Sequence, residues 1–78
     1  MMNKQRRISL VKALHLMYQA QEILSECAQD EQEAFDNMPE GLQGSDRGQQ
    51  MEENAYNLQE WADGLEETIN ELENITEV

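Results

Sequence analysis

The stretch that decides the fold is MEENAYNLQEWADGLEETINEL, residues 51–72. Within it an apolar residue returns alternately after four and after three positions, as Met51, Ala55, Leu58, Ala62, Leu65, Ile69 and Leu72. In an α-helix this spacing places the apolar side chains on one stripe. The stretch therefore predicts a helix that packs lengthwise against another helix.

The N-terminal half predicts that second helix, because it contains no Gly or Pro between Asn3 and Asp36 and is rich in good helix formers. Its apolar residues form a stripe with two flanks. The stripe consists of Leu10, Leu14, Met17, Leu24, Ala28 and Phe35, interrupted by Gln21 and Glu31; Ile8, Val11 and Tyr18 flank it on one side, and Ala13, Leu16, Ala20, Ile23 and Cys27 on the other. One partner helix would not cover so wide an arc, so we expect a further surface to cover the rest.

Residues between the two helices predict a short connector. Pro39 disfavours helix at the residue before it, and Asn37 is expected to cap a short turn that begins near Pro39. Gly41 and Gly44 would supply the backbone freedom that ends this turn. Ser45 is expected to cap the second long helix through its hydroxyl.

These elements predict an all-α, single-domain chain over residues 1–78. It would form an antiparallel two-helix hairpin with a helix at about 3–36, a connector at 37–45 and a helix at about 46–76. A core this small is usually supplemented by self-association, so we expect a homodimer or higher oligomer, such as a four-helix bundle. A parallel two-chain coiled coil is the alternative. The residues expected in the oligomer seam are Leu10, Leu14, Met17, Leu24, Leu58, Leu65, Ile69 and Leu72.

The charge is strongly acidic, with 17 Asp and Glu against five Lys and Arg, a net charge of −12. Such a chain repels phosphate backbones, so direct nucleic-acid binding is not expected. Cations at a helix start and anions at a helix end both oppose the helix dipole, and an antiparallel hairpin would bring these two misplaced groups together. The cations are Lys4, Arg6 and Arg7; the anions are Glu66, Glu67, Glu71, Glu73 and Glu77.

Residues that could carry chemistry are few, and we expect neither an enzyme nor a cofactor or metal site. His15 has no second histidine and no Asp or Glu at helical spacing, so a surface or partly buried histidine is the simpler interpretation. Cys27 is the only cysteine; it has acidic neighbours rather than an activating cation, and a small buried hydrophobe is expected there. No apolar run approaches the ~20 residues that span a bilayer, so we expect a cytoplasmic protein without a membrane contact.

Five apolar or aromatic residues are candidates for binding a partner. Three of them lie in and next to the connector, where they place apolar groups beside acids: Phe35, Met38 and Leu42. The turn residues of the connector are also explained by the reversal of the chain alone. Tyr56 and Trp61 flank the apolar ladder. They would either widen the packed seam or form part of a binding patch, since Trp and Tyr are common hot spots.

The stretch FDNMPEGLQGSDRG, residues 35–48, resembles a family of short acidic helical proteins of bacteriophages and prophages whose function is not established. The resemblance covers about a fifth of the chain, and the flanking helices match only in pattern. It implies a phage-derived accessory protein that acts inside a bacterial host cell by binding a macromolecule or a small ligand. It carries no catalytic residues over to this chain.

Three functional hypotheses follow. The first is an oligomeric helical module that binds a host or phage protein. The second is an acidic decoy that mimics nucleic acid and inhibits a host defence or DNA-binding protein; its face would be made by Glu52, Glu53, Glu60, Asp63, Glu67, Glu71 and Asn74. The third is a sponge for a nucleotide signal, in which cations from several chains meet around phosphates, namely Lys4, Arg6, Arg7 and Arg47.

Overall fold

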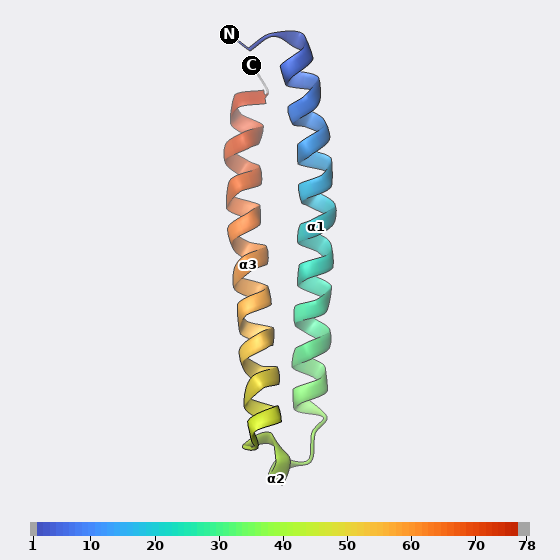
Figure 1. Ribbon diagram of the computed structural model, residues 1–78, viewed down its shortest axis with the longest axis vertical. Coiled ribbons are helices and arrows are strands. Elements are labelled where there is room, and N and C mark those ends of the chain that lie inside the picture. Colours follow the sequence, from blue (N-terminus) through green and yellow to red (C-terminus); the bar gives the residue numbers. More distant parts are fainter. Residues whose placement is uncertain (1, 77–78) are drawn as a thin grey trace.

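Two long antiparallel helices make up almost the whole molecule. The computed structural model describes residues 2–76, which form α1 (Lys4–Asp36), α2 (Glu40–Gln43) and α3 (Asp46–Thr76), with no strand among them. Figure 1 shows α1 and α3 side by side along their full length, with the short α2 at the turn. The predicted all-α hairpin is confirmed, and the predicted ends of both long helices agree with the structure to within one residue.

The hairpin is a narrow rod, with extents of 59 × 14 × 14 Å. The start of α1 and the end of α3 lie at one tip, and the connector forms the other tip (Figure 1). The cationic start of α1 and the acidic end of α3 therefore lie at the same tip, as expected, and contact between these charges stays a prediction. Glu77, which was expected in the acidic group, lies outside the described residues.

The core is the seam between α1 and α3. Its buried apolar residues are Leu14 and Ala28 on α1 and Ala55, Ala62 and Ile69 on α3, the last of these only 1% exposed. Half-buried residues fill the positions three or four residues away from them, namely Leu10, Met17, Leu24, Met51, Leu58, Leu65 and Leu72. Both predicted apolar stripes thus face each other, as the 3–4 spacing requires.

Polar residues interrupt the seam on α1 where the sequence predicted interruptions. Gln21 and Glu31 are both half-buried. The side-chain amide of Asn54 on α3 donates a hydrogen bond to the Glu31 carboxylate across 3.2 Å. This bond satisfies part of the hydrogen-bonding capacity of the Glu31 carboxylate in the seam. It joins residues that are 23 positions apart in the sequence.

The helix ends differ in part from the predictions. Asn3 caps α1, because its side-chain oxygen accepts a bond of 2.8 Å from the backbone N–H of Arg6. Asn37 does not cap the short turn as expected: its own N–H donates to the Glu33 carbonyl at 2.9 Å, so it ends α1, and Pro39 precedes α2 without a side-chain cap. Gly44 ends α2 with φ −83°, a conformation open to any residue.

Candidate functional site

Three hydrogen bonds that involve side chains help to hold the connector tip together. The Gln43 side-chain amide donates to the Phe35 carbonyl at 3.1 Å, which ties α2 back to the end of α1. The Ser45 hydroxyl donates to the Leu42 carbonyl at 2.5 Å and accepts from the Gly48 N–H at 3.2 Å. Ser45 therefore caps α3 as predicted and at the same time anchors the end of α2.

Gly48 permits α2 to lie against the first turn of α3. A Cβ atom at this position would lie 2.8 Å from the carbonyl carbon of Gln43 and 2.8 Å from the carbonyl oxygen of Leu42, both of them backbone atoms. No side chain fits there without a backbone shift. No local sequence pattern predicts this role of Gly48, because the contact joins two elements whose approach no local pattern encodes.

A small apolar hollow opens at this tip. It is lined by Met38, Pro39, Leu42, Ser45, Arg47 and Met51. Leu42 is 52% exposed, whereas Met38 and Met51 are half-buried. Two of the predicted partner-binding residues, Met38 and Leu42, thus share one hollow. Phe35, near the end of α1, is half-buried and does not line it. Arg47 was not among the residues predicted for partner binding.

The other two predicted partner-binding residues lie apart from this tip and from each other. Tyr56 is 68% exposed and Trp61 is 60% exposed. They are five positions apart on α3, and at about 100° per residue this spacing turns their side chains to different sides of the helix. The five predicted residues therefore do not form one patch: three gather at the connector, and two stand on different sides of α3.

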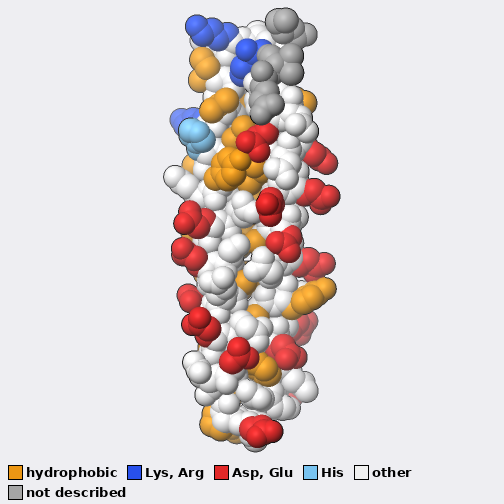
Figure 2. All heavy atoms as spheres, turned by 180° about the vertical axis from the view of Figure 1, so that it is seen from behind, with side chains coloured by type: hydrophobic (Ala, Val, Ile, Leu, Met, Phe, Trp, Pro, Cys, Tyr) orange, Lys and Arg blue, Asp and Glu red, His pale blue; other side chains and the backbone are white. Residues whose placement is uncertain are grey.

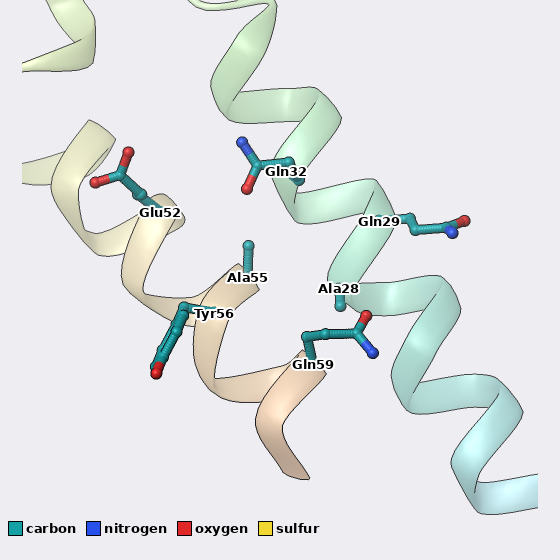
Figure 3. Close-up of a pocket in the computed structure, with 7 residues that line it drawn as sticks. All are labelled: Ala28, Gln29, Gln32, Glu52, Ala55, Tyr56 and Gln59. Carbon is teal, nitrogen blue, oxygen red and sulfur yellow. The ribbon is translucent and has the colours of Figure 1, made fainter. Parts of the chain in front are cut away.

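Beside Tyr56 the two helices leave a second shallow hollow, lined by Ala28, Gln29, Gln32, Glu52, Ala55, Tyr56 and Gln59. Figure 3 shows the short side chains of Ala28 and Ala55 between the helices, with longer polar side chains around them and the Tyr56 ring directed away from α1. The hollow exists because alanine occupies both facing ladder positions. The alanines in both ladders were the signal that could have predicted it.

The eight residues predicted for an oligomer seam all lie in the ladders that α1 and α3 turn towards each other. Leu14 and Ile69 are buried there, and the other six are half-buried. The seam is thus filled within one chain. Contact of these residues with a second chain stays a prediction.

The side of the hairpin seen in Figure 2 is acidic along most of its length, with Lys and Arg near the tip that holds the N-terminal end. On α1 the Tyr18 hydroxyl donates a hydrogen bond to the Glu73 carboxylate of α3, which raises the pKa of Tyr18; slight burial and the negative charges of Glu73 and Glu66 raise it further. The seven residues of the predicted acidic face are all exposed on α3. Their arrangement leaves the carboxylates free to meet a cationic partner.

Cys27 and His15 are both exposed. The expectation that Cys27 is buried is wrong, because the seam takes Leu24 and Ala28 and turns Cys27 outwards. Among residues 2–76 no group of three or more His, Cys, Asp and Glu side chains is placed to hold a metal ion. None of the described helices combines the length and the apolar character that a membrane span needs.

Comparison with known proteins gives no family for this chain. No protein-family model matches it, and the comparisons with curated proteins and with solved structures find no match. The resemblance to phage and prophage proteins therefore rests on the connector sequence alone.

Proposed function

We propose that this chain is a non-enzymatic, phage- or prophage-derived interaction module that acts inside a bacterial cell, assembles with itself and binds a host or phage protein. The observation that carries the proposal is the exposure of large apolar side chains after the seam has been filled. Nine of them are 39–68% exposed, namely Ile8, Val11, Leu16, Tyr18, Ile23, Leu42, Tyr56, Trp61 and Ile75. On a rod this narrow they are too many to be explained by a single hairpin.

The connector hollow supports a protein partner. Its lining combines methionine, proline and leucine side chains with Arg47. Methionine-rich surfaces adapt to apolar side chains of a partner, and Leu42 projects beside them with half of its surface exposed. We assign the contact to Phe35, Met38 and Leu42, with Tyr56 and Trp61 as further contact points along α3.

Capture from a bacterial lysate, followed by mass measurement of the native complex, tests this proposal. We expect a specific protein that stays bound at high salt, because apolar contacts are not screened. Leu42→Ala should abolish capture, whereas Ile8→Ala, which truncates a similarly exposed apolar side chain on α1 (54% against 52%), should keep it. Equal capture by both variants would contradict the assignment of the connector.

The acidic decoy is the second candidate, supported by the exposure of all seven residues of the predicted face. Charge density counts against a mimic of duplex DNA. The net charge of −12 over a length of 59 Å is one charge per about 5 Å, against one per about 1.7 Å of duplex DNA. Loss of capture on adding salt, with no effect of Leu42→Ala, would favour the decoy over the interaction module.

The nucleotide sponge has the least support. Arg47 lies at the connector tip, whereas Lys4, Arg6 and Arg7 lie at the opposite tip of the rod. One chain therefore does not bring the four cations together, and only an assembly of several chains would form such a phosphate pocket.

A further inference from the structure

A second apolar ladder runs along α1 outside the seam. We call it the outer stripe; it consists of Arg6, Ser9, Ala13, Leu16, Ala20, Ile23, Cys27 and Asp30, again at alternating steps of three and four residues. Seven of its members are exposed and Ala13 is half-buried. Leu16 and Ile23 are 59% and 58% exposed. This regular spacing gives the stripe the form of a helix-packing surface with no partner in the chain.

Charge separates the outer stripe from the rest of the surface. It carries one cation at its start and one anion at its end, so its formal charge is zero in a chain of net charge −12. The other side of the hairpin carries Glu52, Glu66 and Glu73 on α3. A second copy that approached that side would meet its own negative charges, whereas the outer stripe offers contact without this repulsion.

We propose that the outer stripe binds the outer stripe of a second copy, with the two α1 helices antiparallel. This inference rests on the proposed function, in which the chain assembles with itself, and it identifies the surface through which two copies bind. When positions that add up to 36 face each other, every large side chain meets a small one. Leu16 lies against Ala20 of the second copy, and Ile23 lies against Ala13 of the second copy.

The same alignment pairs the two charges. Six plus 30 is also 36, so Arg6 of each copy faces Asp30 of the other, and the dimer has two such pairs at the ends of its contact. Ser9 faces Cys27 in the same way. Size and charge thus agree on one alignment, and a two-fold axis at the level of Tyr18 generates all of these contacts at once.

α3 extends this face. Trp61, Thr68 and Ile75 recur every seven residues on the side of α3 that adjoins the outer stripe. Thr68 and Ile75 line a hollow there together with Met17, Leu72 and one acid, Glu71. Trp61 and Ile75 are 60% and 53% exposed in the single chain. A second copy would cover them, so in the dimer Trp61 serves self-assembly instead of the partner contact, while Leu42 and Tyr56 stay free for a different partner.

The size of the face suits a dimer. The outer stripe spans 25 residues, about 36 Å of helix, and the two helices of one copy, each about 10 Å in diameter, give a footprint of about 700 Å² per copy. A stable interface of standard size buries about 800 Å² per partner. The contact is thus large enough for a dimer in the absence of any other protein.

Sedimentation of the purified chain tests the face, with a matched pair of isoleucines. Ile23→Glu should weaken dimerisation at least a hundredfold, because each dimer would bury two unpaired carboxylates. Ile8→Glu introduces the same change at a similarly exposed isoleucine (54% against 58%) outside the outer stripe, and should leave dimerisation unchanged. Both variants should keep their helix content in circular dichroism. A monomeric wild-type chain, or equal weakening by both substitutions, would overturn the proposal.

Exchange of the two charges tests the alignment. Asp30→Arg and Arg6→Asp should each weaken the dimer about tenfold, since each puts like charges opposite one another in two places. The double variant should restore wild-type affinity. Weakening that the double variant does not reverse would overturn this alignment. Because no other protein takes part, failure of either dimer experiment would be distinguishable from failure of lysate capture.

Thiol cross-linking provides an independent measure of the same alignment. Positions 9 and 27 of one helix are about 27 Å apart, so a short bismaleimide can join them only between copies. Ser9→Cys should therefore give a covalent dimer through the natural Cys27 of the second copy. The wild-type chain is the control, because its two Cys27 residues would also be about 27 Å apart in this dimer. Equal cross-linking of both chains would overturn the alignment.

Discussion

α1 carries two apolar ladders of the same spacing. One packs against α3, and the other is exposed to solvent. The inner ladder, with Leu14 and Ala28 buried, is filled by α3 of the same chain. The outer stripe, with Leu16 and Ile23, stays exposed. The two ladders are offset by a single position along the helix, so periodicity alone does not say which one a protein uses for folding and which one it leaves for assembly.

The two ladders of α1 differ in burial because α3 has only one apolar stripe to pack against them. The apolar ladder of α3 is a single narrow stripe, whose buried residues are Ala55, Ala62 and Ile69. Acidic residues border this stripe on one side. A single narrow stripe covers a single narrow stripe. The wide apolar arc of α1 therefore divides into a part that folds the monomer and a part that folding leaves unpaired.

The largest expected effect compares Leu14→Ala with Leu16→Ala. Leu14 is 6% exposed and Leu16 is 59% exposed, so the first substitution removes packed core and the second does not. Leu14→Ala should lower the free energy of unfolding by about 3 kcal/mol, and Leu16→Ala by less than about 0.5 kcal/mol. Urea unfolding followed by circular dichroism, at a concentration where the chain is monomeric, measures both. Equal losses would erase the distinction between the ladders.

A second comparison uses two glycines of α3. Gly48→Ala should lower the free energy of unfolding by about 1–3 kcal/mol, because its Cβ has no room beside the backbone of Leu42 and Gln43. Gly64→Ala should raise it by about 1 kcal/mol, since nothing lies within 4 Å of a Cβ there. Thermal unfolding in an Ile23→Glu background separates these effects from assembly. A stabilising Gly48→Ala would show that α2 does not pack as described.

The smallest expected effect concerns the acidic side of the hairpin. The Tyr18 hydroxyl donates to the Glu73 carboxylate and its pKa lies above the ordinary value of 10.0. A raised pKa in the folded chain means that the contribution to stability is present below pH 10 and is lost as the pH rises through the pKa of Tyr18. Glu73→Gln should lower this pKa towards 10.0.

Ultraviolet titration of tyrosinate in a Tyr56→Phe background measures the change, because Tyr18 is then the only tyrosine. Glu53→Gln is the control: it also removes one negative charge, but Glu53 does not contribute to the pKa shift of Tyr18. An unchanged Tyr18 pKa in Glu73→Gln would contradict the contact between the helices at this level.

The sequence predicted the helices well because its signals there are local. Pro39 and Ser45 mark the connector, and the ladders mark the seam, so each element is specified by its own residues. The candidate site was predicted less well. The exposure of Cys27 and the crowding at Gly48 depend on how elements meet. The separation of Tyr56 from Trp61, in contrast, follows from their spacing of five positions on one helix and was available from the sequence.

The connector lies at one tip of the rod, and this placement has a consequence for valency. In an antiparallel dimer the two connector tips would point in opposite directions, more than 59 Å apart. Such a particle could not seat both tips on one small protein, but it could tether two copies of a target or two sites on an extended one. The overall affinity of the dimer for its target would then depend on simultaneous binding of both tips more than on the affinity of a single tip.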